Sequence, residues 1–206
     1  NLDDPDTAAK LFGKAFDILY AVDTALPYLT PMMGKYLSAL FDSSQHGVAT
    51  EFIADFDKRM ADAMADSERK LTQSGHADDH SSQEWLAHQR LEAAYCEGGL
   101  LHSRMAAEAG DIAKAARIAE KSGERLAGFG NINLACDAFC TAGALFAKLG
   151  DDHASYCYES AMEAAGILNQ RNRRVSIGDT LITLLKSQGR EEEASELASR
   201  VAGLRP

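Results

Sequence analysis

The chain has 206 residues, of which 46% are hydrophobic and 25% charged, and this is enough apolar material for one extended or two small folded domains. Its formal net charge of -10 at pH 7 opposes contact with nucleic-acid phosphates, so no nucleic acid is expected as a partner. No apolar run approaches the roughly 20 residues of a membrane-spanning helix, so no membrane span is expected either.

The cysteines indicate the compartment. All four, Cys96, Cys136, Cys140 and Cys157, fall within helical patterns, where small thiols commonly serve as buried apolar residues. The acidic start of the chain carries no hydrophobic secretory stretch. Reduced thiols and a cytoplasmic location are therefore expected.

Helical periodicity dominates the sequence, and no alternating β-branched run competes with it, so the predicted fold is all-α. Asp4-Pro5 and Thr30-Pro31 each place a capping residue before a proline, which predicts two helix starts. Between them, the prolines in the segment 26–31 predict a turn, because proline lacks an amide donor and restricts the residue before it.

One long amphipathic helix is predicted over about 46–72, with Phe52, Phe56, Met60, Met64 and Leu71 on one stripe. The polar stretch 73–80 predicts a loop, after which the Ser-x-x-Glu spacing of Ser81 and Glu84 is typical of a capping box. Residues 1–80 are thus expected to form an N-terminal helical segment, either a cap or a diverged repeat. Residues 81–206 are expected to form the repeats.

The repeats appear as two segments that match at a fixed offset, from Cys96-Glu97 to Gly110-Asp111 and from Cys136-Asp137 to Gly150-Asp151. A degenerate copy ends at Gly189-Arg190, so the glycines are 40 and 39 residues apart. Each glycine is expected to end the first helix of a pair, and the acid after it to cap the second helix. The predicted helices are 82–109 with 111–127, 132–149 with 152–168, and 172–188 with 191–203.

These residues resemble the tetratricopeptide repeat family over about 85–206. The middle copy matches best, through Phe139, Gly143, Phe146, Gly150, Ser155 and Met162. The first copy keeps Gly110 and Ala115, but departs from the family by having Gly99, Ser103 and Ala106 where larger or glycine residues are usual. The third copy keeps Leu185, Gly189, Ala194 and Val201. The period exceeds the family's usual length of roughly 34 residues. The resemblance implies three antiparallel helix pairs stacked as an α-solenoid.

The resemblance further implies that the first helices line a concave groove that binds a peptide or partner protein. Such a protein would be an interaction module without catalysis or cofactor: an adaptor, a scaffold or a chaperone-like protein. Its acidic charge would favour a basic partner, and a homo-oligomer is left open. A simple solvated surface is an equally open interpretation of the groove residues. By position they are Glu97, Leu100, Arg104, Glu108, Asp137, Cys140, Ala144, Lys148, Ser176, Thr183, Lys186 and Ser187.

The alternative function is a helical metal-binding or small-ligand-sensing protein that uses His80, Glu84 and His88. These residues belong to a row that recurs every four positions from His76 to Cys96, a spacing that helical metal sites use. Against it, His76 and His80 fall in a predicted loop, and no second histidine-carboxylate helix completes a site. Cys136 and Cys140 are one helical turn apart, but no second cysteine pair accompanies them, as a structural zinc site would need. No glycine-rich catalytic loop is present either, so no enzyme activity is expected.

Overall fold

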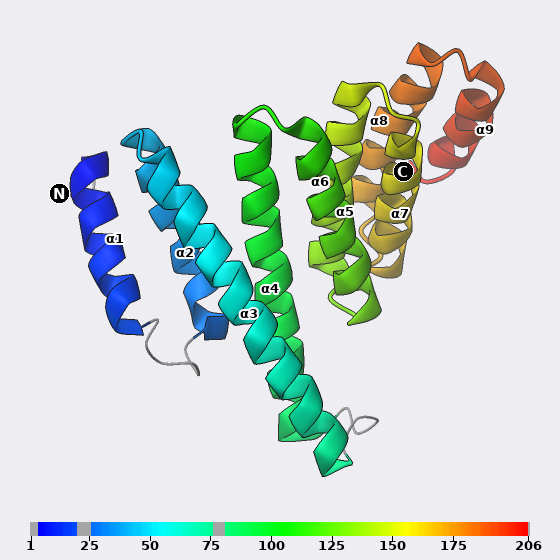
Figure 1. The fold of residues 1–206 in the computed structure, drawn as a ribbon. Helices are drawn as coiled ribbons and strands as arrows, with labels where there is room; N and C mark the ends of the chain where they lie inside the picture. The colour runs from blue at the N-terminus through cyan, green and yellow to red at the C-terminus, as the bar shows by residue number, and fades with distance from the viewer. Residues whose placement is uncertain (1–3, 20–25, 76–80, 206) are drawn as a thin grey trace. The chain divides into compact units, whose positions relative to one another are not determined.

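The computed structural model describes residues 4–19, 26–75 and 81–205 (Figure 1). Within these ranges every regular element is an α-helix, which confirms the all-α prediction. The chain divides into two compact units, residues 1–101 and 102–206, and the boundary falls inside helix α4. The helices of the first unit are α1 (Pro5–Leu19), α2 (Leu26–Asp42), α3 (His46–Ser74) and the first part of α4 (Gln83–Glu108).

The start of α1 follows the prediction, but the start of α2 does not. At α1 the Asp4 carboxylate accepts a hydrogen bond from the backbone amide of Thr7 at 3.2 Å. Helix α2 begins at Leu26 and continues through Pro27 and Pro31, so the turn predicted over 26–31 is wrong. The first four amides of a helix have no intrahelical partner, so Pro27 in the first turn removes no helical hydrogen bond. Pro31 lies beyond the first turn and removes one hydrogen bond.

The long helix α3 confirms the amphipathic pattern, with Phe56, Met60 and Met64 among its buried residues. Aromatic side chains join it to the two preceding helices, because the rings of Phe16 and Tyr36 both lie 4.9 Å from Phe52 between centroids. This cluster forms much of the core of the first unit.

The connection after α3 differs in detail from the sequence prediction. The helix extends to Ser74 and ends at Gly75, which has a φ of 73°. The rest of the predicted loop, residues 76–80, lies outside the described residues. At the start of α4 the hydroxyl of Ser82, one residue after the predicted box, accepts a hydrogen bond from the amide of Trp85 at 3.1 Å.

The second unit contains the end of α4 and five further helices, and from α5 to α9 each helix packs against the next (Figure 1). Their bounds agree with the predicted helix pairs to within a few residues. They are α5 (Ile112–Gly128), α6 (Ile132–Leu149), α7 (His153–Ile167), α8 (Arg171–Ser187) and α9 (Glu191–Ala202).

One type of turn joins all six helices from α4 to α9. A residue with positive φ follows each helix, and the next amide donates to the carbonyl five positions back, as Asp151 does to Phe146 at 3.0 Å. The three predicted glycines are confirmed as helix ends, and two further turns lie between them. The 40-residue sequence repeat is therefore two helix-turn units of about half that length. The positive-φ residues are Gly110, Gly130, Gly150, Asn169 and Gly189.

Helix α6 is the most apolar of the second unit and packs between α5 and α7. By length and composition it could also cross a membrane, the one helix of the described chain for which this holds. The expectation that no segment is long and apolar enough was therefore wrong. Its composition follows from its position, because residues such as Ala135, Phe139 and Ala142 are buried against the neighbouring helices.

Candidate functional site

The predicted groove residues of α6 and α8 lie on the exposed sides of these helices, except for Cys140, which is half-buried. On α6, Asp137, Thr141, Ala144 and Lys148 are exposed and recur every three or four positions, while the residues between them are buried or half-buried. On α8 an equivalent exposed row runs from Ser176 to Ser187. We call these two rows together the polar face of α6 and α8. It comprises Asp137, Thr141, Ala144, Lys148, Ser176, Thr180, Thr183, Lys186 and Ser187.

The predicted groove residues of α4 are less uniform. Arg104 and Glu108 are exposed and form an ion pair with each other at 2.9 Å. Glu97 and Leu100 belong to the first unit and are half-buried. Burial raises the pKa of the Glu97 carboxyl above its usual value. Arg104 is thus an exposed cation that already has an ion-pair partner on its own helix.

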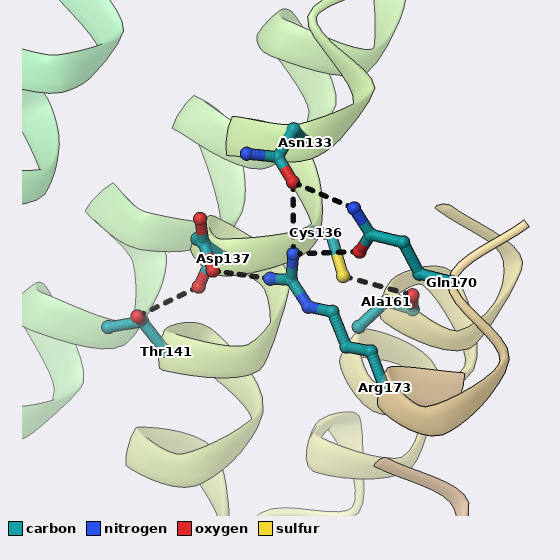
Figure 2. A network of polar contacts seen from close by, with 7 residues as sticks. All are labelled: Asn133, Cys136, Asp137, Thr141, Ala161, Gln170 and Arg173. Atoms are coloured by element: carbon teal, nitrogen blue, oxygen red, sulfur yellow. Dashed lines mark hydrogen bonds and ion pairs between the residues drawn. The ribbon is translucent and has the colours of Figure 1, made fainter. Parts of the chain in front are cut away.

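Arg173 fixes α8 to α6 through a small polar network (Figure 2). Its guanidinium donates to Asn133 at 3.1 Å and to Gln170 at 3.2 Å. It also pairs with the Asp137 carboxylate, and Gln170 in turn donates to Asn133 at 3.3 Å. The Asp137 end of the polar face is therefore held in place, and its charge is offset within the protein.

A second polar link of the same kind joins α7 to the turn between α8 and α9. The amide of Gln188 donates to Asp152 at 3.2 Å, and Arg190 donates to Ser155 at 3.0 Å. These partners are 36 and 35 residues apart, and the pair Gln170 and Asn133 is 37 apart. Side chains that lie in or beside these helices thus exchange hydrogen bonds at a nearly constant sequence distance.

The thiols near this network are held inside the protein, and all four cysteines are free. The thiol of Cys136 is fully buried and lies 3.3 Å from the backbone carbonyl of Ala161, to which it donates (Figure 2). The pKa of the Cys136 thiol is lowered, because the thiol of Cys140 donates to its sulfur and the Arg173 guanidinium lies nearby. The bond to Cys136 and burial raise the pKa of Cys140 itself.

The metal ligands suggested by the sequence lie only in part within the described residues, so their convergence stays a prediction. His80 lies outside those residues, Glu84 is exposed, and His88 lies 3.8 Å from the buried carboxylate of Glu92.

A different set does converge, because Glu120, His153 and Cys157 bring their ligand atoms within 4.8 Å of one another. Sequence reasoning missed this set. The spacing of His153 and Cys157 by one helical turn is visible in the sequence, but Glu120 comes from another helix, 33 residues before His153. No local signal joins it to them.

No protein-family model matches the chain, and no curated protein matches its sequence. Its fold is similar to the crystal structure of BtubC (BKLC) from P. vanneervenii, with a TM-score of 0.67 and 15% sequence identity. The similarity covers 98% of this chain and 72% of that one. At this level of identity the likeness shows the fold alone, which is an all-helical arrangement.

Proposed function

We propose that the chain is a tetratricopeptide-like helical-repeat module that binds a peptide or partner protein on the polar face of α6 and α8. The observation that carries this proposal is the polar face itself. Each helix buries one side against its neighbours and leaves a row of short polar, small and basic side chains exposed. Short side chains let a ligand approach the helices closely and lose little conformational entropy when they are covered.

The uniform turns and the side-chain links at a nearly constant sequence distance support a regular array, and the fold of BtubC is compatible with it. An array of this kind offers an extended surface rather than a deep cavity. A scaffold or adaptor that holds an extended peptide makes use of such a surface, which is the function that we propose.

The charges on the face indicate how the ligand would be held. Arg104 and Asp137 are already paired within the protein, whereas Lys148 and Lys186 make no ion pair in the part of the chain that the structure describes. These two lysines would bind carboxylates of the ligand. The net charge of -10 would attract a ligand with basic groups as well, mainly by increasing the association rate.

Site-specific photocrosslinking in the native host tests the location of binding. A photoreactive side chain at Ala144 or Thr183 lies on the polar face, and one at Glu163 or Ser195 lies on exposed positions of α7 and α9. The proposal expects a defined crosslinked partner from the first two positions and not from the last two. Equal crosslinking from all four, or from the last two alone, would refute it.

The partner identified in this way can then be titrated by calorimetry. Replacing both Lys148 and Lys186 by Ala should weaken binding by at least about tenfold, which is about 1.4 kcal/mol, without a change in melting temperature. The matched control replaces Lys114 and Lys121, two exposed lysines of α5, and should leave affinity nearly unchanged. A larger effect from the control pair would contradict the proposed face.

A further inference from the structure

Three side chains with metal-binding atoms converge between α5 and α7. His153 and Cys157 are one turn apart on α7, and Glu120 reaches them from α5. The Nε2 of His153 contacts Oε1 of Glu120, and the ligand atoms of all three residues lie within 4.8 Å of one another. Two helices that do not follow each other in the chain thus supply one cluster.

The donor set of one carboxylate oxygen, one imidazole nitrogen and one sulfur is a set that Zn²⁺ binds. Bonds of about 2.0 to 2.3 Å in tetrahedral geometry place ligand atoms roughly 3.5 Å apart. The longest separation in the cluster would therefore close by about 1 Å on binding, which side-chain rotation can supply. Three protein ligands would leave the fourth position of the ion to water.

The surroundings of the cluster fit a cation. The His153 ring lies 5.1 Å from Phe146 in an edge arrangement and 5.1 Å from the ring of Tyr156, so its orientation is restrained. The Cys157 sulfur is buried, and the carboxylates of Glu120, Glu124 and Asp151 add negative charge around it. Binding of a cation by the thiolate would release the proton of the Cys157 thiol to solvent.

We propose that Glu120, His153 and Cys157 form a Zn²⁺ site that joins α5 to α7. The ion would tie together the second helices of two successive helix pairs, away from the polar face of α6 and α8. A metal that binds only the folded chain stabilises it in proportion to its concentration and affinity. The site is thus independent of partner binding and can be tested without a partner.

The test uses the full chain, stripped of metal by a chelator and titrated with Co²⁺ and then Zn²⁺. We expect one equivalent of Co²⁺ to give the near-ultraviolet charge-transfer absorption of a cobalt-thiolate bond, and Zn²⁺ to abolish it. We also expect Zn²⁺ to raise the melting temperature. Absence of both effects in the wild-type chain would overturn the proposal.

Variants assign the ligands. Cys157→Ser should lose the charge-transfer absorption, and His153→Gln should weaken Zn²⁺ binding by at least about tenfold, since loss of even an outer-shell partner costs that much. His153 is on the surface, with 46% of its side chain exposed, so this variant leaves the core intact even if the buried Cys157→Ser does not fold. The controls Cys140→Ser and His88→Gln should bind as the wild type does. Binding that survives in His153→Gln, or that is lost in a control, would overturn the assignment.

Discussion

Replacing Gly178 by Ala should destabilise the second unit, although alanine is the better helix former. A Cβ atom on Gly178 of α8 would lie 2.5 Å from Cγ2 of Val201 on α9 and 3.3 Å from Cε of Met162 on α7. Val201 is fully buried and β-branched, so its side chain has little freedom to turn away. The glycine therefore permits a close approach of three helices.

The expected magnitude follows from this geometry. Carbon atoms pack best at about 3.5 to 4.0 Å, so α8 or α9 must shift by about 1 Å to admit the new methyl group. Overpacking of this kind costs about 1 to 3 kcal/mol, and the gain in helix propensity from Gly to Ala returns up to about 1 kcal/mol. A contact of 2.5 Å to a fully buried, β-branched side chain places the cost near the upper end, about 2 to 3 kcal/mol, so the net loss in the free energy of unfolding should be about 1 to 2 kcal/mol.

Urea denaturation followed by circular dichroism measures this loss. The matched control is Gly128→Ala at the end of α5, where an added Cβ meets nothing within 4 Å, and this variant should be as stable as the wild type or slightly more so. In the double variant of Gly178→Ala with Val201→Ala, the combined loss should be smaller than the sum by about 0.5 kcal/mol or more. If Gly178→Ala is as stable as the wild type, the argument from close packing is refuted.

Three further predictions concern the turns, the half-buried carboxyl and the polar network. Gly150 has a φ of 67°, so Gly150→Val should lower the free energy of unfolding by at least about 1 to 2 kcal/mol, and Gly150→Asn should lower it less. Urea denaturation measures both losses, and the reverse order would contradict the role of backbone strain. Since burial raises the pKa of Glu97, the folded chain loses stability as pH rises above the ordinary value of 4.5. Glu97→Gln should therefore be more stable than the wild type at pH 7 but not below pH 4.5, and equal effects at both would refute this. Arg173→Ala should raise the pKa of the Cys136 thiol in an ultraviolet pH titration, whereas an unchanged pKa would show that Arg173 does not act on it.

The helices of the second unit could be predicted because their ends carry local signals. A left-handed residue after each helix favours glycine, so Gly110, Gly150 and Gly189 mark helix ends in the sequence itself. One other residue takes this role. Asn169 follows α7 with a φ of 54°, and asparagine is the residue after glycine that adopts this conformation most readily, which agrees with the helix end predicted at 168.

The errors came from features that only the folded context decides. Pro27 and Pro31 suggested a turn, yet α2 contains both, because proline near a helix start interrupts few hydrogen bonds. The length of the apolar run in α6 was underestimated because alanines, small residues and two cysteines separate its larger side chains. In a packed helix such small residues contact neighbours as closely as large ones do.

Exposure of the polar face was predictable from helical periodicity, but its charge state was not. Periodicity places Asp137 and Lys148 on the same side of α6, and both are exposed. It does not show that Asp137 forms an ion pair with Arg173, which lies 36 residues later in the chain. The cations chosen from sequence as ligand contacts therefore included Arg104, which Glu108 already binds.

Both the polar links and the proposed metal site arise from one consequence of a regular helix-turn unit. When each unit is about 20 residues long, side chains on helices two apart meet at sequence separations somewhat under 40. The observed separations are 33 for Glu120 and His153, and 36 for Asp137 and Arg173. A sequence search for ligands spaced by one helical turn therefore finds only the ligands that a single helix supplies, such as His153 and Cys157, and misses a ligand from a second helix. In the row from His76 to Cys96 the same search found a spacing but no second helix to complete it, and for this reason the row was a weaker candidate than the cluster between α5 and α7.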